Sequence, residues 1–291
     1  MGISINVFNV PLAELGPLAQ HAEKCGFERI LFGDHLIAPM NATSLHPRSD
    51  RANAKVLYEN TPLTDLLVTF GYLSALTDRI GFATGVYILP LREPVATARA
   101  AATVQLISGG RFTFGVGAGW MREEFDIVNI PFETRGKRFD EMIELMKALW
   151  TGDVVDHHGT FWDFEQVQLW PPPEPPIPLI FGGTSVAALR RAARHGDGWF
   201  SPTNYTMDEL LATRDELERM RVEAGTVARP YTYYVRVEGA HDMANVERYR
   251  REGFEDLVLA TSREWRRRDE AFTLDDKLEM LSRRAHALEL L

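Results

Sequence analysis

The stretch RFTFGVGAGW, Arg111–Trp120, decides how the fold is read from the sequence. Its glycines at 115, 117 and 119 follow an apolar run that is typical of a buried strand. Such a stretch could form the turn that cradles a dinucleotide, whose pattern is G-x-G-x-x-G after the first strand of its fold. Here Trp120 stands in the place of the third glycine, and three apolar runs come earlier in the chain. The glycines therefore favour a strand end that bends and lets a flat group approach the backbone closely.

Apolar runs and helical patterns alternate on both sides of this stretch. Parallel pairing is the usual consequence of such alternation, because each crossover returns the chain to the same end of the sheet. The sequence therefore predicts one domain over residues 1–291 with the fold of a closed (β/α)8 TIM barrel, and an open doubly wound sheet is the alternative. The other seven runs are ISINVF (3–8), RILFGD (29–34), RIGFATGVYIL (79–89), LIFGG (179–183), GWFSP (198–202), YTYYVRV (231–237) and DLVLATS (256–262).

Two segments interrupt the alternation. Residues 152–178 contain VVDHHGTFWDF and the Pro-rich PPPEPPIP, which together predict a hairpin inserted between barrel units. His157 and His158 are adjacent, so on a strand they point to opposite faces and do not share one ion easily; we predict no metal site. Residues 35–60 are polar and predict a long loop that could act as a substrate lid.

The composition excludes several classes of protein. The formal net charge is −9, whereas nucleic-acid binding needs a basic surface, so we expect no nucleic-acid partner. No apolar run reaches the roughly 20 residues of a membrane span, and the first ten residues do not resemble a signal peptide. The lone Cys25 fits a reducing compartment, so a cytoplasmic location is expected. The basic run 263–270 could contact an anionic coenzyme tail, but it reads more simply as a solvated face.

Several of these stretches, taken together and in order, resemble the luciferase-like monooxygenase superfamily. The resemblance is carried by GDHL (33–36), by residues 79–125 from RIGFATGVYIL to GWMREEF, and by PPIPLIFGGTSVAALRRAARHGDGWFSP (175–202). It looks closest to the branch that uses the deazaflavin coenzyme F420. It implies a TIM barrel and an oxidoreductase that transfers a hydride between F420 and an organic substrate bound over the coenzyme ring, at the C-terminal face of the barrel. Dimers are common in this superfamily, so a homodimer is expected.

The resemblance also implies where the coenzyme binds. It implies a cis peptide between Gly85 and Val86 that backs the coenzyme ring, and it places Gly117 and Ala118 beside that ring. Many FMN-dependent members have an Arg where this chain has Ala118, and an Ala cannot make a charge-assisted bond to phosphate. This difference favours F420 over FMN. The alternatives are an FMN-dependent monooxygenase and a non-catalytic flavin-binding protein.

The turn after the run LIFGG is the expected phosphate site. Thr184 or Ser185 suits the N-cap of the following helix, and free N–H groups at a helix N-terminus attract anions. By residue pattern alone this could be an ordinary capped turn. The resemblance implies that the phosphate arm of the coenzyme lies here, against the residues Gly182, Gly183, Thr184 and Ser185.

Asp34 is the last residue of the run RILFGD and His35 follows it, at the end of a predicted barrel strand. His is the side chain most easily poised as an acid or base near neutral pH. The pair could also simply cap a loop. The resemblance implies that His35 lies near the reactive carbon of the coenzyme, so His35 is the catalytic candidate and Asp34 a cofactor-binding candidate. No Lys or Glu at a strand end supports a lyase or isomerase on the same barrel.

Overall fold

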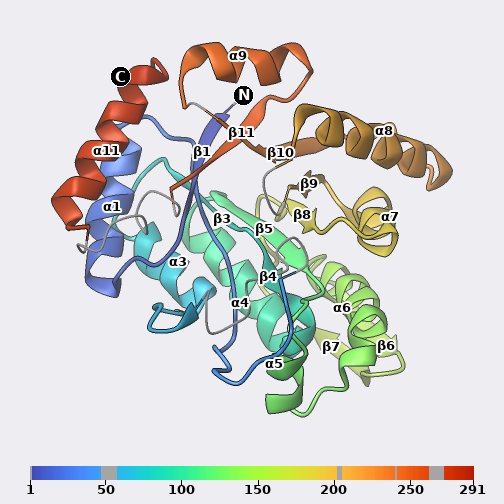
Figure 1. Ribbon diagram of the computed structural model, residues 1–291. Coiled ribbons are helices and arrows are strands. Elements are labelled where there is room, and N and C mark those ends of the chain that lie inside the picture. The colour runs from blue at the N-terminus through green and yellow to red at the C-terminus, as the bar shows by residue number, and fades with distance from the viewer. Residues whose placement is uncertain (1, 47–57, 202–204, 240, 262–271) are drawn as a thin grey trace.

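The computed structural model describes residues 2–46, 58–201, 205–239, 241–261 and 272–291 (Figure 1). The basic run 263–270 and residues 47–57 of the predicted lid lie outside these ranges. Within the described ranges, eight parallel strands close into a barrel in the order β3-β2-β1-β11-β10-β9-β8-β5, and the pairing of β3 with β5 completes the circle. This closure confirms the predicted TIM barrel and excludes the open doubly wound sheet. The strands are β1 (Gly2–Val7), β2 (Arg29–Phe32), β3 (Gly81–Thr84), β5 (Phe112–Gly117), β8 (Leu179–Gly182), β9 (Gly198–Phe200), β10 (Thr232–Arg236) and β11 (Asp256–Ala260).

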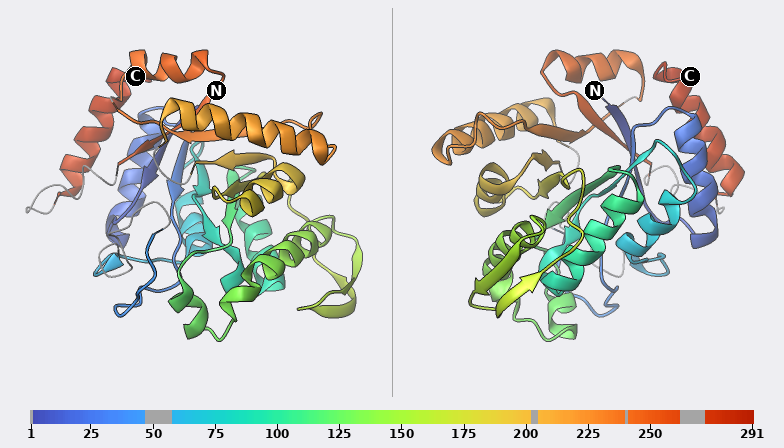
Figure 2. Two further views of the ribbon diagram at one scale, coloured as in Figure 1. Left: turned by 45° about the vertical axis from the view of Figure 1, so that its right-hand side comes forward. Right: turned by 180° about the vertical axis from the view of Figure 1, so that it is seen from behind.

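Helices surround the barrel, as the two views of Figure 2 show. Several of them begin at a side chain that accepts a backbone N–H of the first turn, for example Asp65 before α3 and Ser185 before α7. No helix within the described ranges is long and apolar enough to cross a membrane. The main helices are α1 (Leu12–Lys24), α3 (Leu66–Ser74), α4 (Pro94–Ile107), α6 (Arg135–Leu149), α7 (Val186–His195), α8 (Met207–Glu223), α9 (Met243–Arg251) and α11 (Leu274–Ala287), with the short α5 (Arg122–Ile127) and the 3-10 turns η1 (Leu89–Leu91) and η2 (Phe132–Thr134).

The strands are buried on both faces, which explains why their sequences read as continuous apolar runs. Their outer faces pack against the helices in one large cluster, in which the rings of Phe70 and Phe82 stack at 5.6 Å. Their inner faces fill the barrel lumen with a smaller cluster, so the barrel is a packed core and not a channel. The lumen cluster consists of Leu31, Ala83, Ile180, Phe200, Tyr234 and Val258, with Val86 packed against it.

The glycines of the opening stretch are needed by the barrel itself. A Cβ added at Gly115 would lie 1.9 Å from the carbonyl oxygen of Thr84 on the neighbouring strand β3. A Cβ at Gly117 would lie 2.7 Å from Cγ2 of Val86, and one at Gly182 would lie 2.7 Å from its Cγ1. Close approaches at these glycines are therefore made by strand β3 of the chain itself and by the Val86 side chain that follows it. The approach of a flat ligand remains a prediction.

The predicted insertion is present as an antiparallel hairpin of β6 (Val154–His158) and β7 (Asp163–Gln168). Glu141 on α6 holds its turn, because backbone N–H groups of residues 160–162 donate to this carboxylate at 2.9–3.2 Å. The two adjacent histidines have separate partners: Nε2 of His157 lies 3.3 Å from Glu141, and Nδ1 of His158 lies 2.8 Å from Asp163. The hairpin is thus attached to the outside of the barrel by polar contacts with α6.

Candidate active site at the barrel mouth

The predicted site residues follow four different strands, and all of them lie at the C-terminal edge of the barrel. Asp34 and His35 follow β2, the Gly85–Val86 pair follows β3, Ala118 follows β5, and residues 182–185 end β8 and precede α7. Parallel strands bring these segments to one rim, which is where TIM barrels keep their active sites. The sequence therefore predicted a set of residues that the fold brings to one edge.

The Gly85–Val86 peptide bond is cis, the conformation that the resemblance implies. It lies between β3 and the short β4 (Tyr87–Ile88), which pairs with β5. The side chain of Val86 turns into the barrel and packs on the lumen cluster, while a Cβ at Gly85 would lie 3.2 Å from the ring of Phe200. The bulge therefore closes the top of the lumen. Contact between this bulge and a coenzyme ring remains a prediction.

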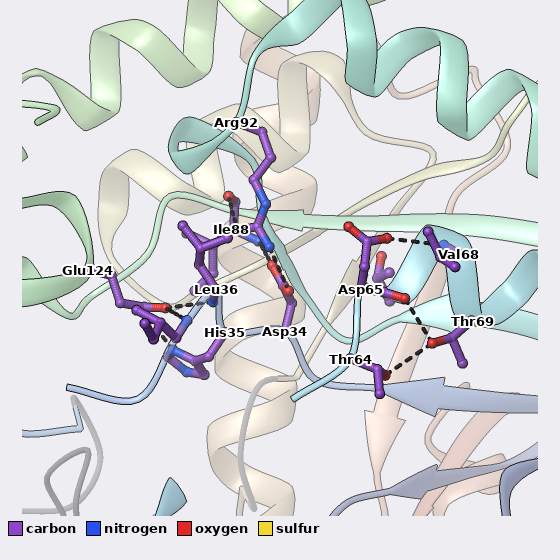
Figure 3. A network of polar contacts seen from close by, with 12 residues as sticks. Asp34, His35, Leu36, Thr64, Asp65, Val68, Thr69, Ile88, Arg92 and Glu124 are labelled. Carbon is purple, nitrogen blue, oxygen red and sulfur yellow. Dashed lines mark hydrogen bonds and ion pairs between the residues drawn. The ribbon is translucent and has the colours of Figure 1, made fainter. Parts of the chain in front are cut away.

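Asp34 is buried beside the bulge, with 5% of its surface exposed. Nη2 of Arg92 donates to its Oδ1 at 2.9 Å, and the backbone N–H of Ile88 donates to its Oδ2 at 2.9 Å (Figure 3). Burial raises the pKa of the Asp34 carboxyl, and the Arg92 guanidinium opposes that rise. Both carboxylate oxygens thus bind groups of the protein and tie the end of β2 to β4. A direct contact between Asp34 and a cofactor stays a prediction.

His35 forms a pair with a residue that the sequence analysis did not single out. Its Nδ1 lies 2.8 Å from Oε2 of Glu124 on α5, and the Glu124 side chain is 0% exposed (Figure 3). The other oxygen of Glu124 accepts the backbone N–H of Leu36 at 2.7 Å and that of Ile37 at 3.4 Å. The buried carboxylate therefore holds both the imidazole ring and the backbone that follows it.

Glu123, the preceding residue of α5, holds the same loop further along. Its Oε1 accepts the backbone N–H of Thr43 at 2.7 Å and that of Ser44 at 3.0 Å. Burial by itself would raise the pKa of Glu123, but the hydrogen bonds from the Ser44 hydroxyl and from these amides lower it to about 2. Two consecutive glutamates of α5 thus anchor residues 35–37 and 43–44 at the barrel mouth.

Aromatic side chains surround the imidazole of His35. Its ring centre lies 4.3 Å from that of Tyr58 and 5.7 Å from that of Trp120, with the Trp120 ring nearly perpendicular. His35 also lines a pocket at the ends of β1 and β2, together with Phe8 and Asn9. Among the described residues no hydrogen bond reaches Nε2 of His35. Nε2 is therefore the ring nitrogen for which the described residues supply no hydrogen-bond partner.

The turn before α7 has the features of an anion site. Ser185 is the N-cap, and its hydroxyl accepts the N–H of Ala188 at 3.2 Å. Thr184 and Ser185 are exposed, and the first turn of α7 carries no acidic side chain. The carbonyl of Gly183 accepts the indole N–H of Trp199 at 3.0 Å, which holds the turn in place. The first N–H groups of a helix have no acceptor within it, so they point toward an incoming anion.

Ala118, the residue that the sequence analysis used to favour F420 over FMN, follows β5 and packs against the main core. It presents a methyl group at the rim and no charge. Within the described ranges no three His, Cys, Asp or Glu side chains converge as metal ligands would. Besides the Asp34–Arg92 ion pair, this rim offers the imidazole of His35, the exposed N-terminus of α7 and apolar side chains.

Comparison with known proteins agrees with this geometry. The family model for luciferase-like monooxygenases matches residues 3–285. The protein Rv0940c of Mycobacterium tuberculosis is 33% identical over 243 residues, which cover 84% of this chain and 83% of that one. An F420-dependent glucose-6-phosphate dehydrogenase of Beutenbergia cavernae is 31% identical over 182 residues, which cover 61% of this chain and 49% of that enzyme.

The fold likeness extends over the full length of a solved structure. The crystal structure of monooxygenase RslO1 from Streptomyces bottropensis matches with a TM-score of 0.77 at 18% identity, covering 99% of both chains. At this identity the match shows the fold alone. The family model, however, spans nearly the whole sequence. The chain belongs to the luciferase-like monooxygenase family, and its relatives include F420-dependent dehydrogenases.

Proposed function

We propose that this protein is an oxidoreductase that transfers a hydride between the deazaflavin coenzyme F420 and an organic substrate. The observation that carries the proposal is the meeting of three features at one barrel rim. These are the apolar bulge at Gly85–Val86, the imidazole of His35, whose Nε2 receives no hydrogen bond from the described residues, and the exposed N-terminus of α7. An F420-dependent dehydrogenase among the relatives supports the choice of coenzyme.

The residues at the rim fit such a coenzyme. The exposed turn at Gly183–Ser185 offers backbone N–H groups to the phosphate arm. The first turn of α7 has no acidic side chain that would repel this phosphate. The bulge over Val86 offers an apolar seat for a flat ring. Ala118 offers no cation for the phosphate of FMN, which favours F420. When bound, the coenzyme would supply a ring carbon that accepts or donates a hydride.

The chain's own part in the reaction is to position the reactants and to move a proton. In the oxidising direction the substrate carbon gives up a hydride, and the heteroatom bonded to it gives up a proton to Nε2 of His35. In the reducing direction the same nitrogen returns the proton. The apolar bulge and the aromatic rings of Tyr58 and Trp120 exclude water from this place.

A paired titration tests the coenzyme. The purified protein is titrated with F420 and, separately, with FMN, and binding is followed by fluorescence. We expect tight binding of F420 and weak binding of FMN. Tight FMN binding, followed by oxygen consumption with reduced FMN, would favour the monooxygenase instead. Binding without turnover for any hydride acceptor would favour a non-catalytic flavin-binding protein.

A charge substitution tests the phosphate site. Thr184→Glu introduces a negative charge at the exposed turn before α7, and F420 should bind at least about tenfold more weakly because like charges repel. Ala212→Glu, at an exposed position of α8, changes the net charge equally and should leave F420 binding unchanged. Equal effects of the two substitutions would remove the turn from the proposed site.

Substitution of the imidazole tests its role. His35→Ala should leave the fold intact and lower turnover at least about a hundredfold if Nε2 carries the proton. A decrease of less than about threefold in both turnover and coenzyme affinity would show that His35 lies outside the site.

We also propose that the protein is a homodimer located in the cytoplasm. Val68 and Tyr72 on α3 and Ile107 on α4 are 73%, 48% and 55% exposed, and such an apolar face suits a second copy of the chain. Light scattering should give twice the chain mass, and Val68→Asp should shift it toward the monomer. A wild-type protein that is monomeric at micromolar concentration would contradict the dimer, and fractionation of cells tests the location.

A further inference from the structure

We propose that Glu124 is a positioning residue that holds neutral His35 as the Nδ1–H tautomer, so that the proton acceptor of the site is Nε2. This inference rests on the proposed function for its consequence in catalysis. The tautomer itself is a property of the protein without coenzyme or substrate.

The hydrogen bonds around Glu124 set its role as an acceptor. Its Oε1 receives two backbone N–H groups, from Leu36 and Ile37, and its Oε2 lies 2.8 Å from Nδ1 of His35. An ionised carboxylate only accepts hydrogen bonds, so the third partner must bring a proton. The imidazole therefore carries its proton on Nδ1.

The same geometry leaves one ring nitrogen for chemistry. In neutral imidazole one nitrogen donates and the other accepts, so a proton on Nδ1 places the lone pair on Nε2. The neighbouring rings of Tyr58 and Trp120 pack against the imidazole and limit its rotation. A carboxylate that fixes the tautomer of a catalytic histidine in this way contributes strongly to turnover in other enzymes without touching the substrate.

Glu124 has a matched control next to it in the chain. Glu123 is on the same short helix and anchors the same loop, but its partners are Thr43 and Ser44 and not the imidazole. A role of Glu124 in loop attachment alone would be shared by Glu123. A role in setting the tautomer would belong to Glu124 only.

The substitution Glu124→Gln is expected to reverse the tautomer. The amide oxygen of Gln can keep the two backbone N–H groups of residues 36 and 37, which turns the amide NH2 toward His35. The NH2 group is a donor, so Nδ1 must become the acceptor and the ring proton must move to Nε2. The variant thus keeps the shape of the site and inverts its proton arrangement.

Nitrogen-15 NMR of the histidine rings measures the tautomer of His35 directly. The protein is used without coenzyme, at a pH high enough for histidine side chains to be neutral. The signals of His35 are identified by their loss in His35→Gln. We expect a protonated Nδ1 and an unprotonated Nε2 in the wild type and in Glu123→Gln, and the reverse in Glu124→Gln. A protonated Nε2 in the wild type, or no change in Glu124→Gln, would overturn the inference.

Turnover with F420 then measures the consequence. Glu124→Gln should lower turnover at least about tenfold with little change in coenzyme affinity, whereas Glu123→Gln should stay within about threefold. In the His35→Ala background, Glu124→Gln should have no further effect, because it acts through the imidazole. Equal losses in the two Gln variants would mean that the loop attachment alone matters. The NMR result stands even if F420 gives no turnover, so failure of the proposed function is distinguishable from failure of this inference.

Discussion

Gly115→Ala should destabilise the barrel more than a Gly→Ala substitution at any other glycine of the stretch 111–120. The added Cβ would lie 1.9 Å from the carbonyl oxygen of Thr84, and a backbone oxygen cannot turn away as a side chain can. Ordinary contact begins at 3.4 Å, so strands β3 and β5 would have to separate by about 1.5 Å. These two strands form the pairing that closes the barrel, at Phe82–Phe112 and Ala83–Thr113.

The free-energy cost has two parts. Overpacking a rigid core typically costs about 1–3 kcal/mol. The separation also breaks the hydrogen bond from Oγ1 of Thr84 to the carbonyl of Gly115, which is 2.6 Å long and buried. Leaving these two groups without partners costs about 1–3 kcal/mol. We therefore expect Gly115→Ala to lower the free energy of unfolding by about 2–6 kcal/mol, which is a large part of the stability of an ordinary domain.

Urea unfolding followed by the fluorescence of the six tryptophans measures this cost. Gly71→Ala is the matched control, because its Cβ would meet only Cδ1 of Ile107 at 3.6 Å, which is ordinary contact. In the interior of helix α3 this substitution should be neutral or should stabilise by about 0.5–1 kcal/mol. A Gly115→Ala variant within about 1 kcal/mol of the wild type, with an unchanged urea dependence, would show that the steric reasoning is wrong.

Three further predictions concern the rim. Gly182→Ala should lower the free energy of unfolding by about 1–3 kcal/mol, because its Cβ would lie 2.7 Å from Val86. Adding Val86→Ala to this variant should restore part of the lost stability, as measured by thermal unfolding. Arg92→Ala leaves the Asp34 carboxylate buried without its cation, so urea unfolding should show a loss of about 3–5 kcal/mol, partly restored by Asp34→Asn. The pKa of Glu123 is lowered to about 2, so its stabilisation is present above the unfolded value of about 4.3 and is lost as the pH falls through about 2. The difference in melting temperature between the wild type and Glu123→Gln should therefore shrink between pH 7 and pH 3.

The barrel could be predicted from the sequence because its signals are local. Each strand shows as a short apolar run, each helix as a 3.6-residue pattern, and their alternation limits the topology to a few folds. The insertion was also predictable, because its polar strands and its Pro-rich end differ in composition from the apolar runs and helical patterns of the barrel units. Asp34 and His35 were predictable as rim residues because they stand at the end of such a run, whereas Gly85 and Val86 lie inside one and were placed by the family resemblance.

The partners of these rim residues were not predictable, because they are distant in the chain. Arg92 lies 58 residues from Asp34, and Glu124 lies 89 residues from His35. No local period or cap relates such pairs, and only barrel closure brings them together. The glycines illustrate the same limit. Their spacing indicated a close approach, but the approaching groups, Thr84 and Val86, were identified only by the pairing of β3 with β5.

Glu124 is the case in which the local pattern is most misleading. The run REEFD reads as a solvated helical turn, and Arg122 and Asp126 are indeed exposed, whereas Glu124 is 0% exposed. Burying a carboxylate costs free energy, and hydrogen bonds offset that cost only when every lone pair is used well. An apolar side chain at this position would avoid that cost but would leave the backbone N–H groups of Leu36 and Ile37 without their acceptor. A glutamine could accept both of these N–H groups and serve the loop equally well, whereas an imidazole that must present Nε2 needs a carboxylate at Nδ1. This is the reason to look for the effect of Glu124 in catalysis before its effect in stability.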